Sequence, residues 1–138
     1  MSDSCCSIIV GGTVTTSQYN DILDRCIWSW EVFQNHEDHL VIEITTSRYA
    51  SLKDYLVENR ISHIEVIDDA DKYLSKKTYY VGEENDSYYY HYDPDGYICV
   101  PSLVIQAVLD DTSDDISLRE ALRKTILPPE LTRFKVKD

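Results

Sequence analysis

The tripeptide Thr-Thr-Ser occurs twice, at residues 15–17 and 45–47, each time where a predicted strand passes into a predicted helix. Hydroxyl groups and free backbone N–H groups at a helix start can bind a phosphate, and Arg48 directly follows the second copy. The same hydroxyls can instead cap the two helices, and we favour capping because the sequence contains no glycine-rich phosphate-binding motif. The candidate ligand-binding residues are Thr15, Thr16, Ser17, Thr45, Thr46, Ser47 and Arg48.

Histidine, cysteine and acidic residues are present, but their spacing matches no enzyme or metal motif. Cys99 and His91 can meet across a hairpin turn, although neither belongs to a known nucleophile signature. The sequence fixes no further zinc ligands beside His36 and His39, and the acids of residues 93–96 lack the spacing of a calcium loop. We therefore expect no metal, no cofactor and no catalytic residue, and we favour a protein that is not an enzyme.

Residues 88–99, YYYHYDPDGYIC, form the most distinctive stretch of the chain. Alternate residues of a strand share a face, so Tyr88, Tyr90 and Tyr92 are expected on one side and the intervening residues on the other. One side is expected to expose tyrosines in a frame of carboxylates, a composition typical of contact surfaces that select a basic partner. The alternative is purely structural, because tyrosine is favoured in strands. The candidate partner-binding residues are Tyr88, Tyr90, Tyr92, Glu83, Glu84, Asp86 and Asp93.

The chain carries a formal net charge of −12, which is unevenly distributed. Residues 1–118 contain 22 acids and 7 bases, whereas residues 119–138 contain 3 acids and 6 bases. Because nucleic acids are bound mainly through lysine and arginine on their phosphates, the body of the chain is expected to repel them. The negative electrostatic field of this acidic body attracts basic proteins instead and speeds their association with the chain. We therefore predict a basic protein partner and no direct binding of nucleic acid.

Apolar periodicity predicts alternating strands and helices in the first half of the chain and short strands after it. Residues 14–27 and 44–57 are similar at an offset of 30 positions, which indicates two successive βα units. The turn sequences EEND and DPDG separate three short strands and indicate an antiparallel meander. The apolar segment 102–109 predicts a buried helix, and capping signals predict another helix at 117–126. Strands are expected at residues 7–14, 39–45, 62–68, 77–83, 87–92 and 96–100, and further helices at 15–33 and 48–59.

The length of 138 residues and the hydrophobic content of 43% fit one compact domain with a single core. We predict an α+β fold, or alternatively an α/β fold. Two N-terminal βα units join a tyrosine-rich antiparallel meander, and helices, including the two C-terminal ones, cover the sheet. Residues 1–6 are expected to be flexible, and residues 128–138 to form a basic tail or an edge strand. No signal peptide or membrane-spanning run is recognisable, so a cytoplasmic protein without membrane contact is expected.

No motif in the sequence identifies a specific family. In size and acidity, the chain is similar to small bacterial or phage proteins that block nucleic-acid-handling enzymes, such as immunity proteins and anti-CRISPRs. This resemblance implies a non-catalytic inhibitor that docks, as a nucleic-acid mimic, on the basic nucleic-acid-binding site of a partner protein. One alternative is a small phosphate- or nucleotide-binding enzyme domain that uses the Thr-Thr-Ser turns. Another is a self-associating structural protein, for example a homodimer in which the basic tail of one chain meets the acidic body of another.

Overall fold

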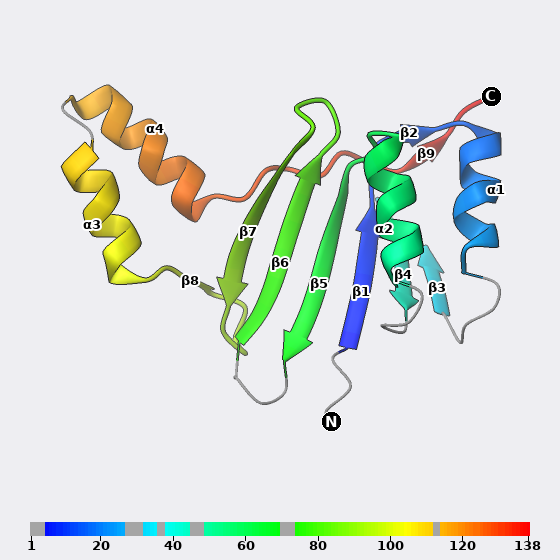
Figure 1. The fold of residues 1–138 in the computed structure, drawn as a ribbon, viewed down its shortest axis with the longest axis horizontal. Helices are drawn as coiled ribbons and strands as arrows, with labels where there is room; N and C mark the ends of the chain where they lie inside the picture. The colour runs from blue at the N-terminus through cyan, green and yellow to red at the C-terminus, as the bar shows by residue number, and fades with distance from the viewer. Residues whose placement is uncertain (1–4, 27–31, 36–37, 45–48, 70–73, 112–113) are drawn as a thin grey trace.

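The computed structural model describes residues 5–26, 32–35, 38–44, 49–69, 74–111 and 114–138 (Figure 1). The described elements are β1 (Cys5–Val10), β2 (Thr13–Val14), α1 (Thr16–Asp24), β3 (Val32–Asn35), β4 (Leu40–Ile44), α2 (Tyr49–Glu58), β5 (His63–Asp69), β6 (Leu74–Val81), β7 (Asp86–Tyr92), β8 (Ile98–Cys99), α3 (Ser102–Asp111), α4 (Asp115–Ile126) and β9 (Lys135–Val136). Of the segment 1–6, which the sequence predicts to be flexible, residues 5 and 6 belong to β1 and the others lie outside the described residues.

The main sheet has seven strands in the order β3-β4-β1-β5-β6-β7-β8, and all neighbouring strands run antiparallel. β1 lies between β4 and β5, so that Ile8 pairs with Ile42 on one side and with Glu65 on the other. Outside this sheet, β2 and β9 form a two-stranded parallel pair. The α+β class is therefore confirmed, and the α/β alternative does not describe a sheet in which each pair is antiparallel.

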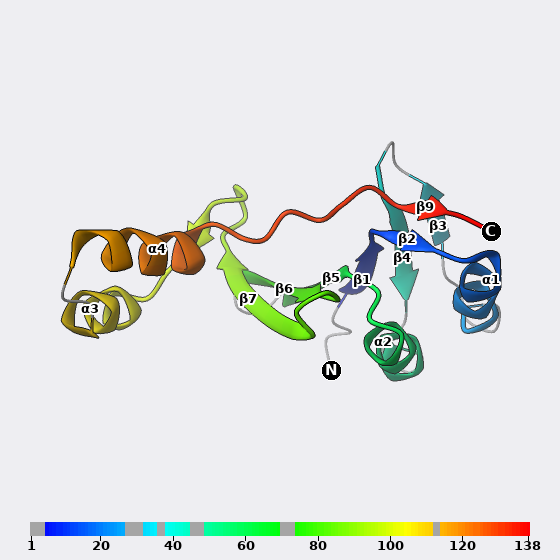
Figure 2. The ribbon, with the colours of Figure 1, turned by 90° about the horizontal axis from the view of Figure 1, so that it is seen from above.

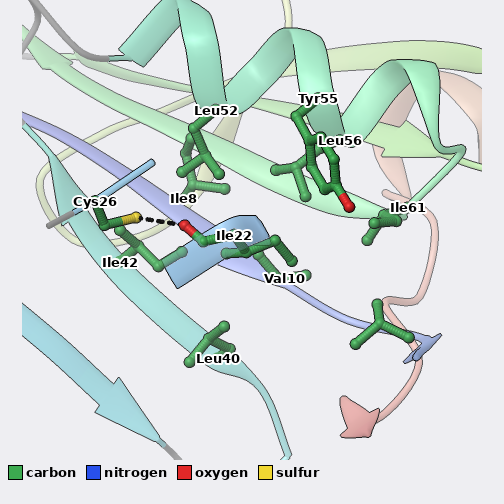
Figure 3. Close-up of a cluster of buried hydrophobic side chains, with 11 residues drawn as sticks. Ile8, Val10, Ile22, Cys26, Leu40, Ile42, Leu52, Tyr55, Leu56 and Ile61 are labelled. Atoms are coloured by element: carbon green, nitrogen blue, oxygen red, sulfur yellow. Dashed lines mark hydrogen bonds between the residues drawn. The ribbon is translucent and has the colours of Figure 1, made fainter. Parts of the chain in front are cut away.

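The core lies between one face of the sheet and the helices α1 and α2 (Figure 3). Strand alternation places Ile8 and Val10 of β1 on this face, while Ile9 between them stays half-exposed. Leu52 and Leu56 are one turn apart on α2 and therefore point to the sheet together. The two βα units predicted from the sequence repeat thus build the core. Its buried apolar residues are Ile8, Val10, Val14, Ile22, Cys26, Leu40, Ile42, Leu52, Tyr55, Leu56 and Ile61.

α1 is shorter than the helix predicted for residues 15–33. Thr15 caps it with a capping box: its hydroxyl accepts a hydrogen bond from the Gln18 N–H at 3.1 Å, and the Gln18 side-chain carbonyl accepts one from the Thr15 N–H at 2.9 Å. The helix ends at Asp24, and the segment Val32–Asn35 forms β3, which pairs with β4. The helix prediction is wrong for this segment, because valine and phenylalanine fit a strand as well as an apolar helix face and the pairing with β4 decides between them.

α3 and α4 confirm the two predicted C-terminal helices, but not the predicted burial of α3. They form a hairpin beyond the β7–β8 edge of the sheet, at the left of Figure 1, and the core face of the sheet is covered by α1 and α2 instead. Within these two described helices, no residue is buried. The chain path explains the difference, because β8 contains only two residues and the chain then leads away from the sheet.

After α4 the chain returns along the sheet to β9, on the side opposite to α2 (Figure 2). The Phe134 N–H donates a hydrogen bond to the Asp38 carbonyl at 2.7 Å, and the Arg133 guanidinium forms an ion pair with the Asp38 carboxylate at 2.7 Å. The segment 128–138, which the sequence predicts as a basic tail or an edge strand, thus supplies β9 and joins the two ends of the described chain.

The β6–β7 hairpin approaches the connection between α2 and β5 closely at Gly82. The Gly82 N–H donates a hydrogen bond to the Ser62 hydroxyl at 2.9 Å, and a Cβ atom at Gly82 would overlap the backbone carbonyl of Arg60. We therefore expect Gly82→Ala to lower the free energy of unfolding by about 3 kcal/mol in urea denaturation, because backbone atoms must move. The control Gly96→Ala has open space but a φ of 90°, and should cost only about 1 kcal/mol. If the two variants lost equal free energies of unfolding, the close approach of Gly82 to the Arg60 backbone would be contradicted.

Candidate functional site

The β6–β7 hairpin carries most of the candidate partner-binding residues. Its two strands pair along their length up to Val81 and Asp86, next to the turn. Asn85 in this turn has a φ of 52°, and its side-chain carbonyl accepts a hydrogen bond from the Tyr80 hydroxyl at 2.8 Å. The same hydroxyl lies 3.2 Å from the carbonyl oxygen of Val57 in α2. The turn is therefore fixed relative to the helix that covers the core.

The tyrosines of β7 divide between two faces, as strand alternation predicts. Tyr90 and Tyr92 are buried: the Tyr90 hydroxyl donates a hydrogen bond to the Lys124 carbonyl of α4 at 2.9 Å, and the Tyr92 hydroxyl lies 3.0 Å from that of Tyr79. Burial, together with this hydrogen bond, raises the pKa of Tyr79. Of the three tyrosines predicted to contact a partner, only Tyr88 is half-exposed, because Tyr90 reaches the end of α4 and Tyr92 packs against β6.

Two tyrosines that the sequence prediction missed are exposed. Tyr89 is 63% exposed on the other face of β7, where the Lys76 ammonium lies 4.8 Å from the centre of its ring and His91 packs edge-on against it. Tyr97 is 71% exposed in the connection to β8. Alternation fixes which residues share a face, but it does not say which face meets the core, and no other signal in the sequence separates the two.

The predicted acidic residues lie at two ends of β7. Glu83, Glu84 and Asp86 are exposed together at the turn after β6, whereas Asp93 follows the last residue of β7. A strand of seven residues spans roughly 20 Å, so the four carboxylates do not form one patch. The Asp93 carboxylate also accepts hydrogen bonds from two backbone N–H groups of the following turn, at 3.0 and 2.9 Å. We refer to Glu83, Glu84, Asp86 and Tyr88 as the acidic turn.

No carboxylate of the acidic turn takes part in an ion pair among the described residues, although Glu83 lies in one cleft with Arg60, Arg133 and Lys135. The ion pairs among the described residues join α2 to β5 and Arg133 to Asp38, so none of them neutralises this turn. The Tyr88 hydroxyl donates a hydrogen bond to the Glu84 carboxylate at 2.7 Å. This bond, with partial desolvation and the neighbouring negative charges, raises the pKa of Tyr88 to about 12. Tyr88 therefore stays protonated at neutral pH and acts as a donor that orients Glu84.

Among the described residues, no strand pairs with most of the outer edge of β7. β8 pairs only with His91 and Tyr92, and the Asp93 N–H donates a hydrogen bond to the Tyr97 carbonyl at 2.9 Å. Because backbone groups of alternate residues point to the same neighbour, Tyr89 directs its N–H and C=O to the side of β8, but beyond the end of that strand. A cleft of about 370 Å³ lies along this edge. It is lined by residues 87–91 of β7 and by Ile98, Cys99, Val100, Pro101, Val104, Lys124 and Thr125.

The same cleft contains the one histidine–cysteine pair that the sequence suggested. His91 and Cys99 are cross-strand partners, and the Cys99 thiol lies 3.8 Å from the Tyr97 carbonyl. Among the described residues, no group of three or more histidine, cysteine or acidic side chains is placed to hold a metal ion. The same part of the chain contains no helix with the length and apolarity needed to cross a membrane.

The first Thr-Thr-Ser turn is engaged within the chain. Thr15 caps α1, and the Thr16 hydroxyl donates a hydrogen bond to the Asp138 carboxylate. A carboxylate thus already lies at the helix start, where a bound anion would lie. Ser17 is exposed in the first turn of α1. The second copy, with Arg48, lies outside the described residues, so the expected pairing of the two turns is not described.

Basic residues gather at a second cleft, which the sequence did not indicate. Arg60, Arg133 and Lys135 line a volume of about 480 Å³ together with Glu83 and the glycines at 11–12. The N–H groups of both glycines already donate hydrogen bonds to backbone carbonyls, at 3.0 and 3.1 Å, so they are not available to an anion in this cleft. Only folding brings position 60 beside positions 133 and 135, which is why sequence spacing could not reveal the cluster.

Two buried ionisable residues of β5 belong to the core. The His63 Nδ1 atom lies 2.8 Å from the Ile61 carbonyl, and the His63 ring stacks on Tyr80 with centroids 5.2 Å apart. Burial lowers the pKa of His63 and so favours its neutral form. Glu65 forms an ion pair with Lys53 of α2 at 3.2 Å. These contacts hold α2 against β5 and β6, and neither residue lines the two clefts described above.

No family model, no curated protein and no solved structure matches this chain. Similarity therefore assigns it neither a family nor a function. The two clefts and the acidic turn are interpreted from their own geometry and charge.

The hydrogen bond between Tyr88 and Glu84 can be measured through the titration of Tyr88. Glu84→Ala removes the acceptor, so we expect the pKa of Tyr88 to fall from about 12 toward the ordinary tyrosine value of about 10. In the wild type, the folded chain then holds a proton between about pH 10 and pH 12 that the unfolded chain has released, so this contribution to stability is lost as the pH rises through that window.

NMR of a chain labelled at tyrosine Cζ measures this pKa directly. Glu83→Ala is the matched control, because Glu83 is a neighbouring exposed acid without a bond to Tyr88 and should leave the pKa nearly unchanged. An ordinary Tyr88 pKa in the wild type would show that the bond does not form in solution.

Proposed function

We propose that this protein is a non-catalytic, acidic protein-binding inhibitor that docks on the basic, nucleic-acid-binding site of a partner protein. The observation that carries the proposal is the acidic turn. Glu83, Glu84 and Asp86 are exposed together at the end of a hairpin that is fixed to the core, and no ion pair of the described residues neutralises them. A fixed array of carboxylates attracts the lysine and arginine side chains that otherwise hold phosphates.

The open edge of β7 supplies a second kind of contact beside the acidic turn. Tyr89 offers a backbone N–H and C=O, and addition of a partner strand to such an edge is a common mode of protein recognition. The rings of Tyr88 and Tyr89 and the apolar side chains of Pro101 and Val104 line the cleft along this edge. In this proposal the carboxylates of the acidic turn attract a basic partner. The outer edge of β7 and the cleft beside it then fix the partner's orientation.

The class of partner follows from the charge. A nucleic-acid-handling enzyme or effector subunit must carry a basic site that remains open to a long polyanion, and such a site is complementary to the acidic turn. The inhibitor acts by occupying those cations, so no metal, cofactor or catalytic side chain takes part. Immunity proteins and anti-defence proteins such as anti-CRISPRs are the classes whose role this proposal matches.

The proposal predicts how charge reversal affects a captured partner. The full chain is used to capture its partner from the native host, and the affinity of the purified pair is then measured. We expect the combined variant Glu83→Lys, Glu84→Lys and Asp86→Lys to bind at least about 100-fold more weakly, because like charges facing each other cost several kcal/mol. The partner's own nucleic acid should displace the wild-type protein.

The matched control reverses three exposed acids away from the hairpin, with Asp24→Lys, Asp54→Lys and Glu58→Lys. This variant changes the net charge by the same amount, so a loss caused by overall charge alone would appear in both variants. The surface assignment fails if the two variants bind equally well. The inhibitor function itself fails if the captured partner has no nucleic-acid-binding site or keeps its activity in the complex.

The basic cleft favours a second candidate function, the binding of a phosphate or a nucleotide. Arg60, Arg133 and Lys135 place three cations around one volume on an otherwise acidic chain. Arg133 is held by Asp38, so Arg60 and Lys135 are the more available donors. This candidate differs from the site expected at the Thr-Thr-Ser turns, because it uses the α2–β5 connection and β9 instead.

Thermal denaturation with inorganic phosphate and a panel of nucleotides tests the second candidate. A ligand that binds the native chain raises the melting temperature with its concentration by mass action. The variant Arg60→Asn with Lys135→Ser should abolish the rise, and asparagine is chosen because Arg60 has a φ of 53°. An unchanged melting temperature across the panel would exclude this function for the cleft.

A further inference from the structure

The helix α3 carries a wide apolar stripe, which is typical of a helix that packs against other elements. The stripe contains Leu103, Val104, Ile105, Val108 and Leu109, and Ser102, Gln106 and Asp110 form the narrower polar face. Yet none of the residues of this helix is buried, and Leu103 is 81% exposed. The described part of the chain therefore does not supply the cover that such a helix needs in water.

α4 extends the same exposed apolar surface. Ile116 is 73% exposed, and Ile126 and Leu127 at the other end are also exposed. The hairpin projects from the edge of the sheet (Figure 1). It is anchored at its base, where the Tyr90 hydroxyl donates a hydrogen bond to the Lys124 carbonyl. Exposed apolar side chains that gather on one element of an otherwise acidic protein mark an interaction surface.

Charge is separated along the length of this hairpin. Its tip carries four exposed aspartates, and its base carries the exposed Arg123 and Lys124. Two hairpins side by side in antiparallel orientation bring the tip of each against the base of the other, whereas a parallel orientation brings the two acidic tips together. The helices have ten and twelve residues, about 15 and 18 Å, so both ends can meet at once. The aspartates of the tip are Asp110, Asp111, Asp114 and Asp115.

We propose that the α3–α4 hairpin binds the same hairpin of a second copy of this chain, in an antiparallel four-helix arrangement with twofold symmetry. Leu103 and Ile116 lie in the contact, and the charged ends fix its orientation. A second copy is selected because one hairpin carries both complementary charges. Its tip is acidic and its base is positively charged, so two identical hairpins attract each other at both ends. The contact does not involve the acidic turn, although Val104 and Lys124 of the hairpin also line the cleft beside β7.

Sedimentation equilibrium of the full chain tests the association. We expect the mass to rise to twice 16.0 kDa as the concentration of the chain is increased to about 100 µM. Leu103→Glu combined with Ile116→Glu should give the monomer, because both carboxylates would be buried in the contact. Both positions are highly exposed in a single chain, so circular dichroism should show an unchanged fold. Tyr97→Glu, an equally exposed position outside the hairpin, is the control and should stay dimeric.

A charge swap tests the antiparallel orientation. Arg123→Glu with Lys124→Glu places acids against acids at both ends of the dimer. Asp110→Lys, Asp111→Lys and Asp115→Lys together leave one acid and three bases at the tip and so place bases against bases, while Asp114 is kept because it caps α4. Each variant alone should sediment as a monomer, and an equimolar mixture should recover the dimer, because opposite charges then meet again at both ends. A merely structural effect of either variant would not be reversed by mixing.

Three results would overturn the proposal. The first is a wild-type chain that sediments at 16.0 kDa throughout the concentration range. The second is a wild-type dimer that the Leu103 and Ile116 variant leaves intact. The third is a monomer that binds vesicles of anionic phospholipid through the hairpin, in which case a membrane and not a second copy covers the apolar surface.

Discussion

The antiparallel pairing of β1 with both β4 and β5 is the constraint on which the rest of the molecule depends. It places a strand from the start of the described chain in the middle of the sheet and turns Ile8 and Val10 to one face. α1 and α2 cover that face, and each strand from β5 to β8 then adds to the edge of its predecessor. The acidic turn therefore owes its position to a series of local pairings that begins at a buried strand.

Tyrosine serves two purposes in this structure, and the direction of its side chain decides which one. On the face toward α4, Tyr90 and Tyr92 bring large apolar rings into a region with few aliphatic residues and satisfy their hydroxyls within the chain. On the other face, Tyr89 is largely exposed to solvent beside Lys76. The hairpin is thus held by one set of tyrosines and presents another. An acidic partner-binding surface can be built on it without weakening the core.

Several features of the fold are predictable from the sequence because they rest on local physics. The Thr-Thr-Ser repeat predicted two strand-to-helix units, and the expected hydroxyl cap of the first helix is present, at Thr15 rather than at Thr16 or Ser17. The turn sequences predicted the meander, since EEND and DPDG can hardly continue a strand. These predictions depend on neighbours within a few residues of one another, and they needed no knowledge of the packing.

The remaining features depend on contacts between distant positions, which periodicity does not report. An apolar α3 suggested burial, but the path of the chain after β8 leaves it exposed. The prediction that successive side chains of β7 alternate between two faces is confirmed. Which of these faces is buried depends on where α4 lies. The basic cleft joins Arg60 to residues more than seventy positions away, and the candidate turn at residues 45–48 lies outside the described residues.

The parallel pairing of β2 with β9 has a consequence for the order in which the chain folds. Thr16 and Asp138, whose hydrogen bond lies beside this pair, are 122 positions apart, whereas the strands from β5 to β8 are joined by short turns. Closing so long a loop costs conformational entropy that is recovered only when the intervening sheet is already compact. β9 is therefore expected to dock last and to detach first. Its release would open the basic cleft while leaving the seven-stranded sheet intact, so hydrogen exchange at residues 135–136 should be faster than in β1.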